Sequence, residues 1–489
     1  MKLNALIGRI PGKVETVGNV DQAEITALCI DSRKVCPGAL FFCTPGTRMD
    51  AHDFAPQAVE KGAAALIVER RLDVAVPQVI VEDVRVATSY IAAAFYGHPA
   101  DEMTMIGITG TKGKTTTSFL VKSIMDEAGY KTGLIGTVCS MIGEETIPSS
   151  LTTLDPVETQ ALLRRMADAG VQCVVMEVSA HATAMHRLAG VRFKVGAFSN
   201  FSQDHLDFFK DMDEYFAAKM KLFEPGVCDE IVYNVDDERV SAAIHALGRQ
   251  ALRIGIREPS DVYANDIEVG ERGCSFLMTW HKRFRTSISL RLAGIFNVYN
   301  ALLAAGIAIC AGVGPEAIRR GLEDVRAVPG RIELLDTGNT PYRVILDYAH
   351  SPDALENILK AVRDTTKGRL IALFGCGGAR DHTKRPIMGE IAGELADYCI
   401  LTSDNPRNEN PMDILDAIEE GIRPTGCAYT VIENRREAIR YALGFAKKDD
   451  VVVLAGKGHE TYQEINGVKH PFDEKIIVAE LLREMSQGV

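Results

Sequence analysis

A short glycine-rich segment in the first quarter of the chain carries residue types that bind nucleotide phosphates. An apolar run at 103–108 leads into it, and a helix-forming run at 116–128 follows. A turn between such a strand and helix presents backbone N–H groups at a helix N-terminus, where the helix dipole also favours an anion. Lys114 can reach the outer phosphates, and the Thr115 hydroxyl can bind Mg²⁺. Although Ile108 stands where the usual pattern begins with glycine, we predict a triphosphate site formed by Gly110, Thr111, Lys112, Gly113, Lys114, Thr115 and Thr116.

Three further side chains could serve the same site. Glu177 lies in the apolar run 171–178, whose continuous apolar character is typical of a parallel strand covered on both faces. Ligands collect at the carboxyl ends of such strands, so a carboxylate there could hold Mg²⁺ between two phosphates. His205 could bind a second Mg²⁺, although imidazole is an unusual ligand for so hard an ion and a structural histidine is the alternative. Lys219, on a helix expected at 212–223, would by itself be a solvated side chain.

The composition limits the classes of protein that can carry these groups. The chain has 489 residues, enough for about three domains, and 46% of them are hydrophobic. The formal net charge of -12 argues against a protein that coats nucleic acid. The N-terminus is too weakly apolar for a secretory signal, and we see no run near the ~18 apolar residues that span a bilayer. The eleven cysteines form no C-x-x-C pattern, so we expect reduced thiols in a cytoplasmic protein without membrane insertion.

The pattern of strands and helices predicts an α/β protein with domains at 1–100, 101–328 and 329–489. Glycine and proline at 97–99 and 328–330 mark the boundaries. The first domain should contain strands at 40–43, 64–68 and 78–81, with helices at 51–61 and 89–96. The second should contain a strand at 195–199, antiparallel strands within 262–293 and a helix at 297–311. The third should contain strands at 343–347, 369–374, 398–402, 429–432 and 451–454, with helices at 414–422 and 435–446.

Polar loops follow three strands of the last domain, at 375–381, 404–407 and 456–460. The carboxyl ends of parallel strands meet at one edge of a sheet, so these loops should form one binding face. The sequence therefore predicts a second substrate on this last domain.

Several ordered blocks of the sequence also resemble the signature blocks of the Mur ligases, the ATP-dependent amide-forming enzymes of peptidoglycan synthesis. The blocks lie at 109–115, 176–179, 200–207, 215–219, 297–301, 329–331 and 347–352. The resemblance extends through all three predicted domains. It implies an N-terminal α/β domain for a uridine nucleotide, a central P-loop ATPase domain with a parallel sheet, and a Rossmann-like C-terminal domain.

The resemblance implies roles for individual residues. Lys114, Glu177, His205 and Lys219 would be catalytic, and Thr115, Glu177, His205 and a carbamylated Lys219 would hold Mg²⁺. Residues 110–116 would bind ATP together with Asn297, Arg331 and Asp347. The substrate UDP-N-acetylmuramoyl-L-alanyl-D-glutamate would contact Ser32, Thr47, Arg48, Thr152, Thr153, Ser179 and Arg187. Met185 stands where this family branch often has glutamine, and we assign it no role.

The loop 404–407 resembles the motif of the branch that adds meso-2,6-diaminopimelate. This amino acid has a second carboxylate, which the guanidinium of Arg407 could bind through two hydrogen bonds. Lysine has no carboxylate there, and Arg407 would repel its ammonium group. The remaining contacts to the amino acid would come from Arg380, Asp404, Asn405, Pro406, Gly456 and Glu460.

The expected reaction is the phosphorylation of a D-glutamate carboxylate by ATP, followed by attack of an amino group on the acyl phosphate. The alternatives are a lysine-adding ligase of the same family, folylpolyglutamate synthase, a P-loop GTPase and a nucleotide-sensing module. Folylpolyglutamate synthase has no counterpart of the ~100 residues that precede the P-loop here. A sensor would not need Lys219 or Arg407. We expect a monomer.

Overall fold

The computed structural model describes residues 1–46, 49–149, 151–270, 273–281, 284–363 and 365–487. The chain divides into two compact units that alternate along the sequence. The first comprises Met1–Thr109, Tyr130–Gly196 and Ala217–Ile231, and the second comprises Gly110–Gly129, Ala197–Phe216 and Val232–Val489. The strands β11 (Phe193–Phe198) and β12 (Cys228–Asn234) and the helix α7 (Met212–Met220) each run from one unit into the other. The boundaries of the three predicted domains stay a prediction.

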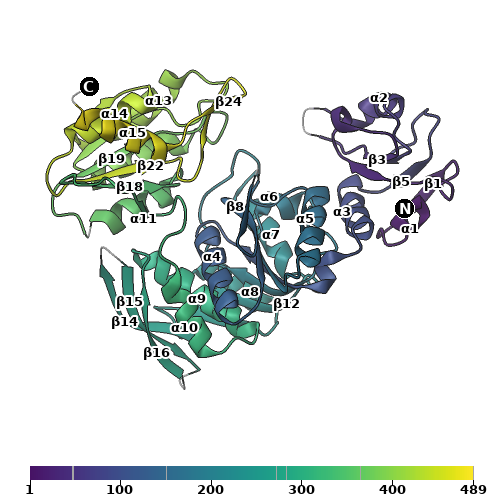
Figure 1. The fold of residues 1–489 in the computed structure, drawn as a ribbon, viewed down its shortest axis with the longest axis horizontal. Helices are drawn as coiled ribbons and strands as arrows, with labels where there is room; N and C mark the ends of the chain where they lie inside the picture. The colour runs from purple at the N-terminus through teal and green to yellow at the C-terminus, as the bar shows by residue number, and fades with distance from the viewer. Residues whose placement is uncertain (47–48, 150, 271–272, 282–283, 364, 488–489) are drawn as a thin grey trace. The chain divides into compact units, whose positions relative to one another are not determined.

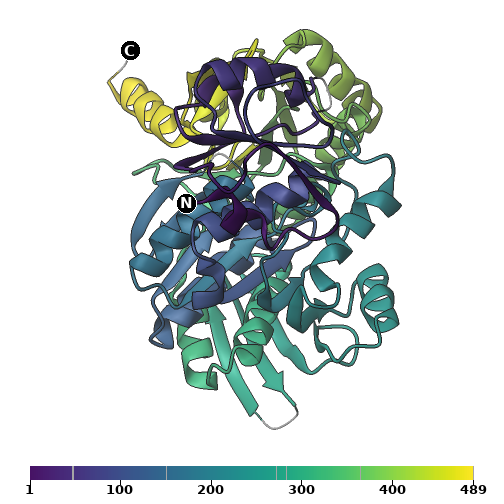
Figure 2. The ribbon, with the colours of Figure 1, turned by 90° about the vertical axis from the view of Figure 1, so that its right-hand side faces the viewer.

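The N-terminal part of the first unit is a sheet in the order β1-β5-β4-β3-β2 with helices on both faces (Figures 1 and 2). Its strands are β1 (Val14–Val17), β2 (Ala27–Cys29), β3 (Ala39–Phe42), β4 (Ala65–Val68) and β5 (Gln78–Val81), and its helices are α1 (Leu3–Ile7), α2 (Ala55–Glu60) and α3 (Val84–Phe95). The predicted strands are confirmed to within one residue. The helix predicted at 89–96 begins at Val84, because the Asp83 carboxylate accepts the N–H groups of Arg85 and Val86.

The rest of the first unit is an α/β layer in the strand order β6-β10-β7-β8-β9. Its elements are β6 (Thr104–Thr109), β7 (Thr132–Ile135), β8 (Cys139–Ile142), β9 (Glu145–Pro148), β10 (Cys173–Glu177), α5 (Pro156–Asp168) and α6 (Ala180–Ala184), after the 3-10 turn Pro99–Glu102. The strands β6, β10 and β7 are parallel, and all residues of β10 are buried, as predicted for this run. Glu177 pairs in register with Ile108, two residues before the glycine-rich turn.

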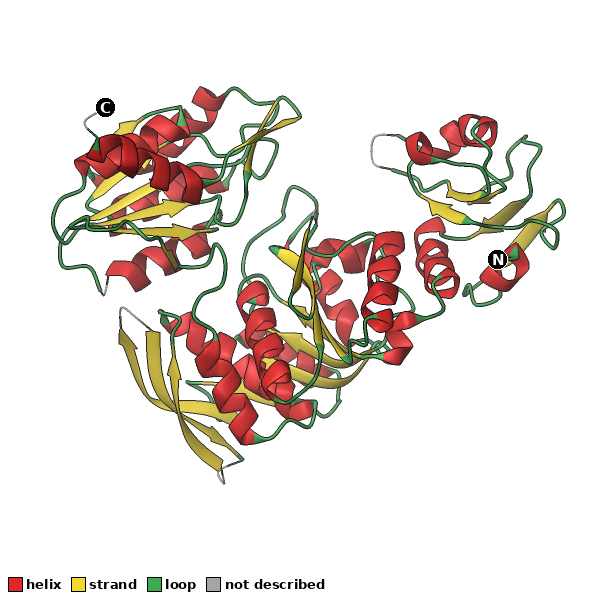
Figure 3. Ribbon diagram, in the orientation of Figure 1, coloured by secondary structure: helices red, strands yellow, loops and turns green. Residues whose placement is uncertain are grey.

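The central part of the second unit contains the helix that follows this turn, α4 (Lys114–Glu127). It packs against α9 (Ile295–Cys310) and α10 (Pro315–Asp324), and the Ser123 hydroxyl donates to the Gly321 carbonyl over 2.8 Å (Figure 3). In this unit α8 (Glu238–Ala246) and β13 (Leu252–Gly255) precede the strands β14 (Val262–Gly270), β15 (Gly273–Trp280) and β16 (Phe284–Leu290), whereas the 3-10 turn Lys221–Phe223 belongs to the first unit. The antiparallel pairing of β14 with β15 and of β15 with β16 confirms the prediction for 262–293.

The C-terminal part is a sheet in the order β17-β18-β22-β19-β20-β21, parallel except for β17. Its strands are β17 (Glu333–Leu334), β18 (Arg343–Asp347), β19 (Leu370–Phe374), β20 (Tyr398–Leu401), β21 (Tyr429–Val431) and β22 (Val451–Ala455). Five of these strands and the helices predicted here are confirmed, except that α13 begins three residues earlier than expected. Asn410 causes this early start, because its side chain accepts the Met412 N–H.

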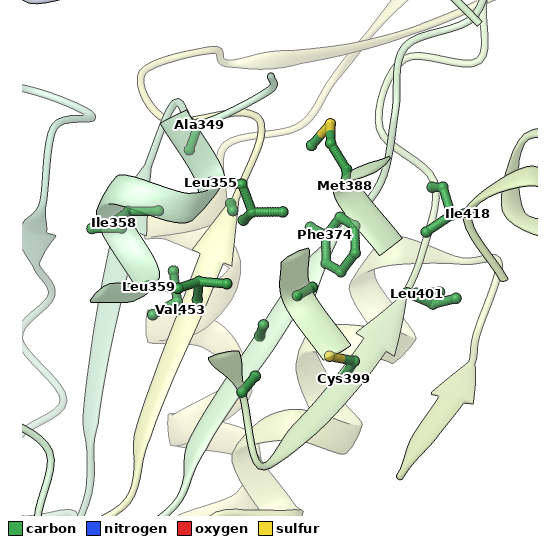
Figure 4. Close-up of a cluster of buried hydrophobic side chains, with 14 of the residues drawn as sticks. Ala349, Leu355, Ile358, Leu359, Phe374, Met388, Cys399, Leu401, Ile418 and Val453 are labelled. Atoms are coloured by element: carbon green, nitrogen blue, oxygen red, sulfur yellow. The ribbon is translucent and has the colours of Figure 1, made fainter. Parts of the chain in front are cut away.

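Helices cover both faces of this sheet. One face carries α11 (Pro352–Arg363), α12 (Lys384–Leu395) and α13 (Pro411–Ile422), and the other carries α14 (Arg435–Phe445) and α15 (Glu474–Ser486). Figure 4 shows the first of these cores, in which Leu355, Leu359, Met388 and Ile418 pack against Phe374 and Leu401. A hairpin of β23 (Tyr462–Ile465) and β24 (Val468–Pro471) was not predicted. Among the residues described, every helix is too short or too polar to span a bilayer.

Candidate functional site

The glycine-rich turn between β6 and α4 is fixed by residues at the end of β11. The Thr111 N–H donates to the Asn200 carbonyl over 2.8 Å, and the Lys112 N–H donates to the Asn200 side chain over 2.9 Å. The Ser199 hydroxyl and the Asn200 amide both donate to the Lys112 carbonyl, over 2.6 and 3.0 Å. Ser199 and Asn200 were not among the predicted site residues. They lie close to 90 positions away, so local sequence patterns cannot identify this contact.

Both glycines of the turn are required by the contacts around them. A Cβ at Gly110 would lie 1.9 Å from the Ser199 hydroxyl, and one at Gly113 would lie 2.3 Å from Oδ1 of Asn300. Both also have positive φ, at 138° and 84°. Asn300 donates to Oδ1 of Asn297 over 2.9 Å, so the predicted ATP residue Asn297 belongs to the layer that supports the turn.

The turn presents positive charge at the start of α4. The Lys114 ammonium donates to the carbonyls of Gly110 and Thr111, each over 2.9 Å, which holds it above the turn. The N-cap residue of α4 is Gly113, which makes no side-chain cap hydrogen bond. A helix N-terminus that follows a glycine and lies beside a lysine is an arrangement that suits an anionic phosphate group.

The side chain of Lys112 turns away to Asp204, with an ion pair of 3.0 Å between Nζ and Oδ2. Burial opposes ionisation of Asp204, but the neighbouring Lys112 and His205 hold its pKa well below the ordinary value. His205 itself has a positive φ of 58°, and its side chain is 39% exposed. The imidazole is therefore accessible at the loop that follows β11.

Of the two predicted ATP residues in the last part of the chain, Arg331 contacts the start of α4, and Asp347 lies near Arg331. The Arg331 guanidinium donates to the Thr115 hydroxyl over 3.2 Å and lies 4.9 Å above the Tyr348 ring. The Asp347 carboxylate accepts the N–H groups of Ile332 and Ala349, over 2.7 and 2.8 Å. Burial raises the pKa of Asp347, although the nearby Arg331 opposes this shift.

A second cluster, in the first unit, surrounds Glu177. Its carboxylate accepts the Thr137 N–H over 3.0 Å and the Thr137 hydroxyl over 2.9 Å. Thr152 lies 3.0 Å from the same hydroxyl. The Thr153 hydroxyl donates to the Glu177 carbonyl over 2.8 Å and accepts the Ser179 N–H over 3.0 Å. The structure thus brings together Glu177, Thr152, Thr153 and Ser179, and it adds Thr137, which the sequence analysis missed.

The other predicted residues of the first unit are placed as follows. The Arg187 guanidinium donates to the Thr153 carbonyl over 2.8 Å, and burial lowers its pKa. Lys219 on α7 is only 1% exposed, and Lys221 in the 3-10 turn that follows is half-buried. Ser32 begins a 3-10 turn (Ser32–Lys34), and its carbonyl accepts the Lys61 ammonium over 2.9 Å. Thr47 and Arg48 lie outside the described residues.

The three polar loops of the C-terminal sheet do converge on one edge. Asn405 donates to the Glu460 carboxylate over 2.8 Å, and its carbonyl accepts the Gly378 N–H over 2.9 Å. Arg407 donates to the Gly378 carbonyl over 2.7 Å. A Cβ at Gly456 would lie 2.4 Å from the Asp404 carboxylate, so Gly456 allows close contact between two of the loops.

The hairpin β23–β24 fixes Arg407. The Arg407 N–H donates to the Glu464 carbonyl over 3.0 Å, and its guanidinium Nε lies 3.3 Å from the Glu464 carboxylate. The residue also has a positive φ of 52°, directly after Pro406. Its side chain is 23% exposed, so part of the guanidinium faces outward. Arg380 is exposed and pairs with Asp207 over 3.0 Å.

Asp404 has an oxygen that no described group satisfies. Its Oδ1 accepts the Asn405 N–H over 2.7 Å, whereas its Oδ2 is buried and has no hydrogen-bond partner among the described residues. Burial opposes ionisation, but Lys457 and Arg435 hold the pKa of Asp404 below its ordinary value. Burial raises the pKa of Glu460. An ionised carboxylate with an open oxygen is suited to receive an ammonium group.

Within the described residues, no group of three or more His, Cys, Asp or Glu side chains lies together as a metal site. The predicted Mg²⁺ ligands include only two such residues, Glu177 and His205, and depend on a hydroxyl and a carbamate for the rest. That chemistry fits a hard cation only if the buried Lys219 becomes carbamylated, since an ammonium group cannot bind a metal ion.

The chain matches family models over most of its length. Residues 24–112 match the catalytic domain model of the Mur ligase family, residues 108–308 the Mur ligase middle domain, and residues 330–458 the glutamate ligase domain of the Mur ligases. It is 44% identical over 486 residues to the UDP-N-acetylmuramoyl-L-alanyl-D-glutamate--2,6-diaminopimelate ligase of Caldanaerobacter subterraneus, covering 99% of each chain. It is 43% identical over 492 residues to the enzyme of that name from Bacillus licheniformis, covering 99% of this chain and 100% of the other.

Two solved structures are similar over nearly the whole chain. A UDP-N-acetylmuramoyl-L-alanyl-D-glutamate--2,6-diaminopimelate ligase has 31% identity and a TM-score of 0.69, with 99% of each chain covered. A MurF ligase from Thermotoga maritima in complex with ADP has 18% identity and a TM-score of 0.64, with 96% of this chain and 99% of the other covered. The second similarity concerns the fold alone.

Proposed function

Because this chain belongs to the Mur ligase family, we propose that it is an ATP-dependent ligase that joins meso-2,6-diaminopimelate to UDP-N-acetylmuramoyl-L-alanyl-D-glutamate in peptidoglycan synthesis. The observation that carries the proposal is the similarity to ligases of this activity over nearly the full length of the chain. We assign residues 1–100 to the nucleotide end of the muramoyl substrate, 101–328 to ATP and 329–489 to the amino acid. We also propose that the enzyme acts in the cytoplasm.

The turn at 110–116 would bind the ATP phosphates. Its Lys114 ammonium and the N-terminus of α4 would supply the positive charge that a triphosphate needs. Arg331, close to the Thr115 hydroxyl, would add a further positive charge, and Asn297 and Asp347 would complete the ATP site.

Thr115, Glu177, His205 and a carbamylated Lys219 would hold Mg²⁺, which when bound would neutralise part of the phosphate charge. The carbamate accounts for a lysine with a 1% exposed side chain in a site for cations, because the modification replaces the ammonium with an anionic ligand.

The distal carboxylate of the D-glutamate would attack the γ-phosphorus of ATP, which forms an acyl phosphate and releases ADP. Thr152, Thr153, Ser179 and Arg187 would hold the muramoyl dipeptide, and their hydrogen-bonded arrangement limits its freedom before the attack. Lys114 would stabilise the charge that accumulates on the phosphoryl group.

The C-terminal loops would bind the amino-acid substrate. Arg407 would bind the distal carboxylate of diaminopimelate, Arg380 another carboxylate, and Asp404 and Glu460 ammonium groups, with Asn405, Pro406 and Gly456 completing the site. The open oxygen of Asp404 supports this assignment, because an ammonium group would satisfy it. The amino group of diaminopimelate would then attack the acyl phosphate, and phosphate would leave.

A ligation assay with a mass-spectrometric readout tests the function. Purified protein is incubated with the UDP-muramoyl dipeptide, ATP, Mg²⁺ and either diaminopimelate or lysine, and the UDP-muramoyl product is identified by mass spectrometry. We expect the tripeptide with diaminopimelate only. Equal reaction with lysine would contradict the selectivity, and ATP hydrolysis without any ligation would favour a nucleotide-sensing module.

A further inference from the structure

One fully buried cation at the amino-acid site has no role in the proposed reaction. Lys457, in the loop after β22, is 0% exposed. Its ammonium lies 3.1 Å from Oδ1 of Asn405 and 3.0 Å from Oε2 of Glu460. Lysine is almost never fully buried unless it is paired, because its ammonium loses the hydration that water provides. A lysine at this position therefore needs a specific explanation.

The contacts of Lys457 connect the loops that form the site. Oδ1 of Asn405 accepts both the Lys457 ammonium and the Glu464 N–H, the latter over 2.9 Å. The Asn405 amide donates to the same Glu460 oxygen that Lys457 contacts. One ammonium thus ties the loop after β20 to the loop after β22, and Asn405 extends the network to the β23–β24 hairpin that fixes Arg407.

The charges of the network leave one carboxylate without a partner. The buried Arg435 pairs with Glu474 over 2.7 Å, and both side chains are 0% exposed, so this pair is neutral. Lys457 pairs with Glu460 over 3.0 Å, with the Lys457 side chain 0% and the Glu460 side chain 14% exposed. Asp404 remains as a buried carboxylate whose Oδ2 has no hydrogen-bond partner among the described residues. Of the two carboxylates assigned above to ammonium groups, Asp404 is therefore the one whose charge is left for the substrate.

We propose that Lys457 is a positioning residue for the amino-acid substrate, which holds Asn405 and Glu460 in place and leaves Asp404 as the carboxylate that receives the substrate's ammonium group. The inference rests on the proposed function. It also explains why two carboxylates can be close together in a buried site: without the lysine, their mutual repulsion would favour protonation of one of them. The ammonium group of the amino acid would then face a protonated or displaced carboxyl group instead of an ionised carboxylate.

The test compares Lys457→Met with Lys469→Met. Methionine has a similar length but no charge, and Lys469 is an exposed lysine of the β23–β24 hairpin that follows the Lys457 loop, 4.1 Å above the Tyr462 ring. For Lys457→Met we expect the KM for diaminopimelate to rise at least tenfold, while the KM values for ATP and the UDP-muramoyl dipeptide change less than twofold. For Lys469→Met we expect all three KM values to change less than twofold.

A KM for diaminopimelate within twofold of wild type, or an equal rise of all three KM values, would overturn the proposal, since the second result is that of a general structural defect. Thermal unfolding shows whether each variant is folded. If Lys457→Met does not fold, Lys457→Gln keeps a hydrogen-bond donor and removes only the charge, and the same two criteria apply to it. Wild-type protein that fails to ligate diaminopimelate would instead refute the proposed function.

Discussion

The turn before α4 offers a precise test of how the P-loop is held. In Gly110→Ala, the new Cβ would lie 1.9 Å from the Ser199 hydroxyl and 3.1 Å from the Asn200 carbonyl. Ordinary contacts begin near 3.4 Å, so the Ser199 hydroxyl must rotate away and lose its hydrogen bond to the Lys112 carbonyl, while the Asn200 carbonyl must shift by about 0.3 Å. Because Ser199 and Asn200 hold Lys112, this rearrangement loosens the turn that would surround the phosphates.

The expected loss follows from this loosened support of the turn. Misplacement of a reacting group by ~1 Å can reduce catalysis on the order of 100-fold. We therefore expect Gly110→Ala to lower kcat/KM for ATP by roughly 100-fold, equivalent to about 2.7 kcal/mol. The strain of alanine at a φ of 138° should also reduce stability by about 1–3 kcal/mol.

Gly129→Ala is the matched control. Gly129 follows the same helix with a φ of 87°, and no described atom lies within 4 Å of its Cβ position. Alanine there should cost about 1–2 kcal/mol of stability and leave kcat/KM for ATP within twofold. Initial rates at varied ATP concentration and thermal unfolding measure both effects. A Gly110→Ala enzyme whose kcat/KM falls no further than that of Gly129→Ala would refute the reasoning.

Three further predictions concern the other groups of the site. Arg407→Ala should raise the KM for diaminopimelate roughly 10- to 100-fold, because a charge-assisted bidentate contact is lost; an equal rise in the KM for ATP would count against it. Lys219→Ala should nearly abolish turnover, and addition of short carboxylic acids should restore part of it, whereas Lys221→Ala should stay active. Absence of recovery at every acid concentration would contradict the proposal that Lys219 is carbamylated. Burial of the imidazole away from water, together with the nearby Lys384 and Lys112, lowers the pKa of His350 to about 3, below its value of ~6.5 in an unfolded chain. As pH drops below about 6.5, His350 is therefore protonated in the unfolded state but not in the folded state, which lowers the free energy of unfolding. Between pH 7 and pH 5, denaturant unfolding should show that the free energy of unfolding of wild type falls by about 1–2 kcal/mol more than that of His350→Gln. Parallel losses in the two proteins would contradict that assignment.

The sequence was sufficient to predict the positions of most strands and the residues that meet at their ends. Glu177 could be placed next to the P-loop strand because a continuous apolar run identifies a buried parallel strand. The cluster of Asp404, Asn405 and Glu460 could be predicted because the strands before them, β20 and β22, both run parallel to β19, which lies between them in one sheet.

The support of the site could not be predicted in this way. Asn300 touches the P-loop from a helix that begins almost 200 residues later, and Glu464 reaches Arg407 from a hairpin with mostly polar, exposed strands. Neither contact leaves a local period in the sequence, because both depend on tertiary packing. The burial of Lys457 could likewise not be predicted, since a lysine in a polar loop is usually exposed.

The packing of α4 has a consequence for how the chain folds during synthesis. Ser123 on this helix bonds to Gly321, 198 residues further along, and a Cβ at Gly321 would lie 2.4 Å from the Ile124 Cα. At ~5–20 residues per second, a ribosome needs roughly 10–40 s to supply that partner. Leu120, Val121 and Ile124 of this helix are all buried in the finished protein, and the packing of α4 against α10 cannot form during this interval. The nucleotide-binding turn therefore emerges early but can become rigid only late in translation.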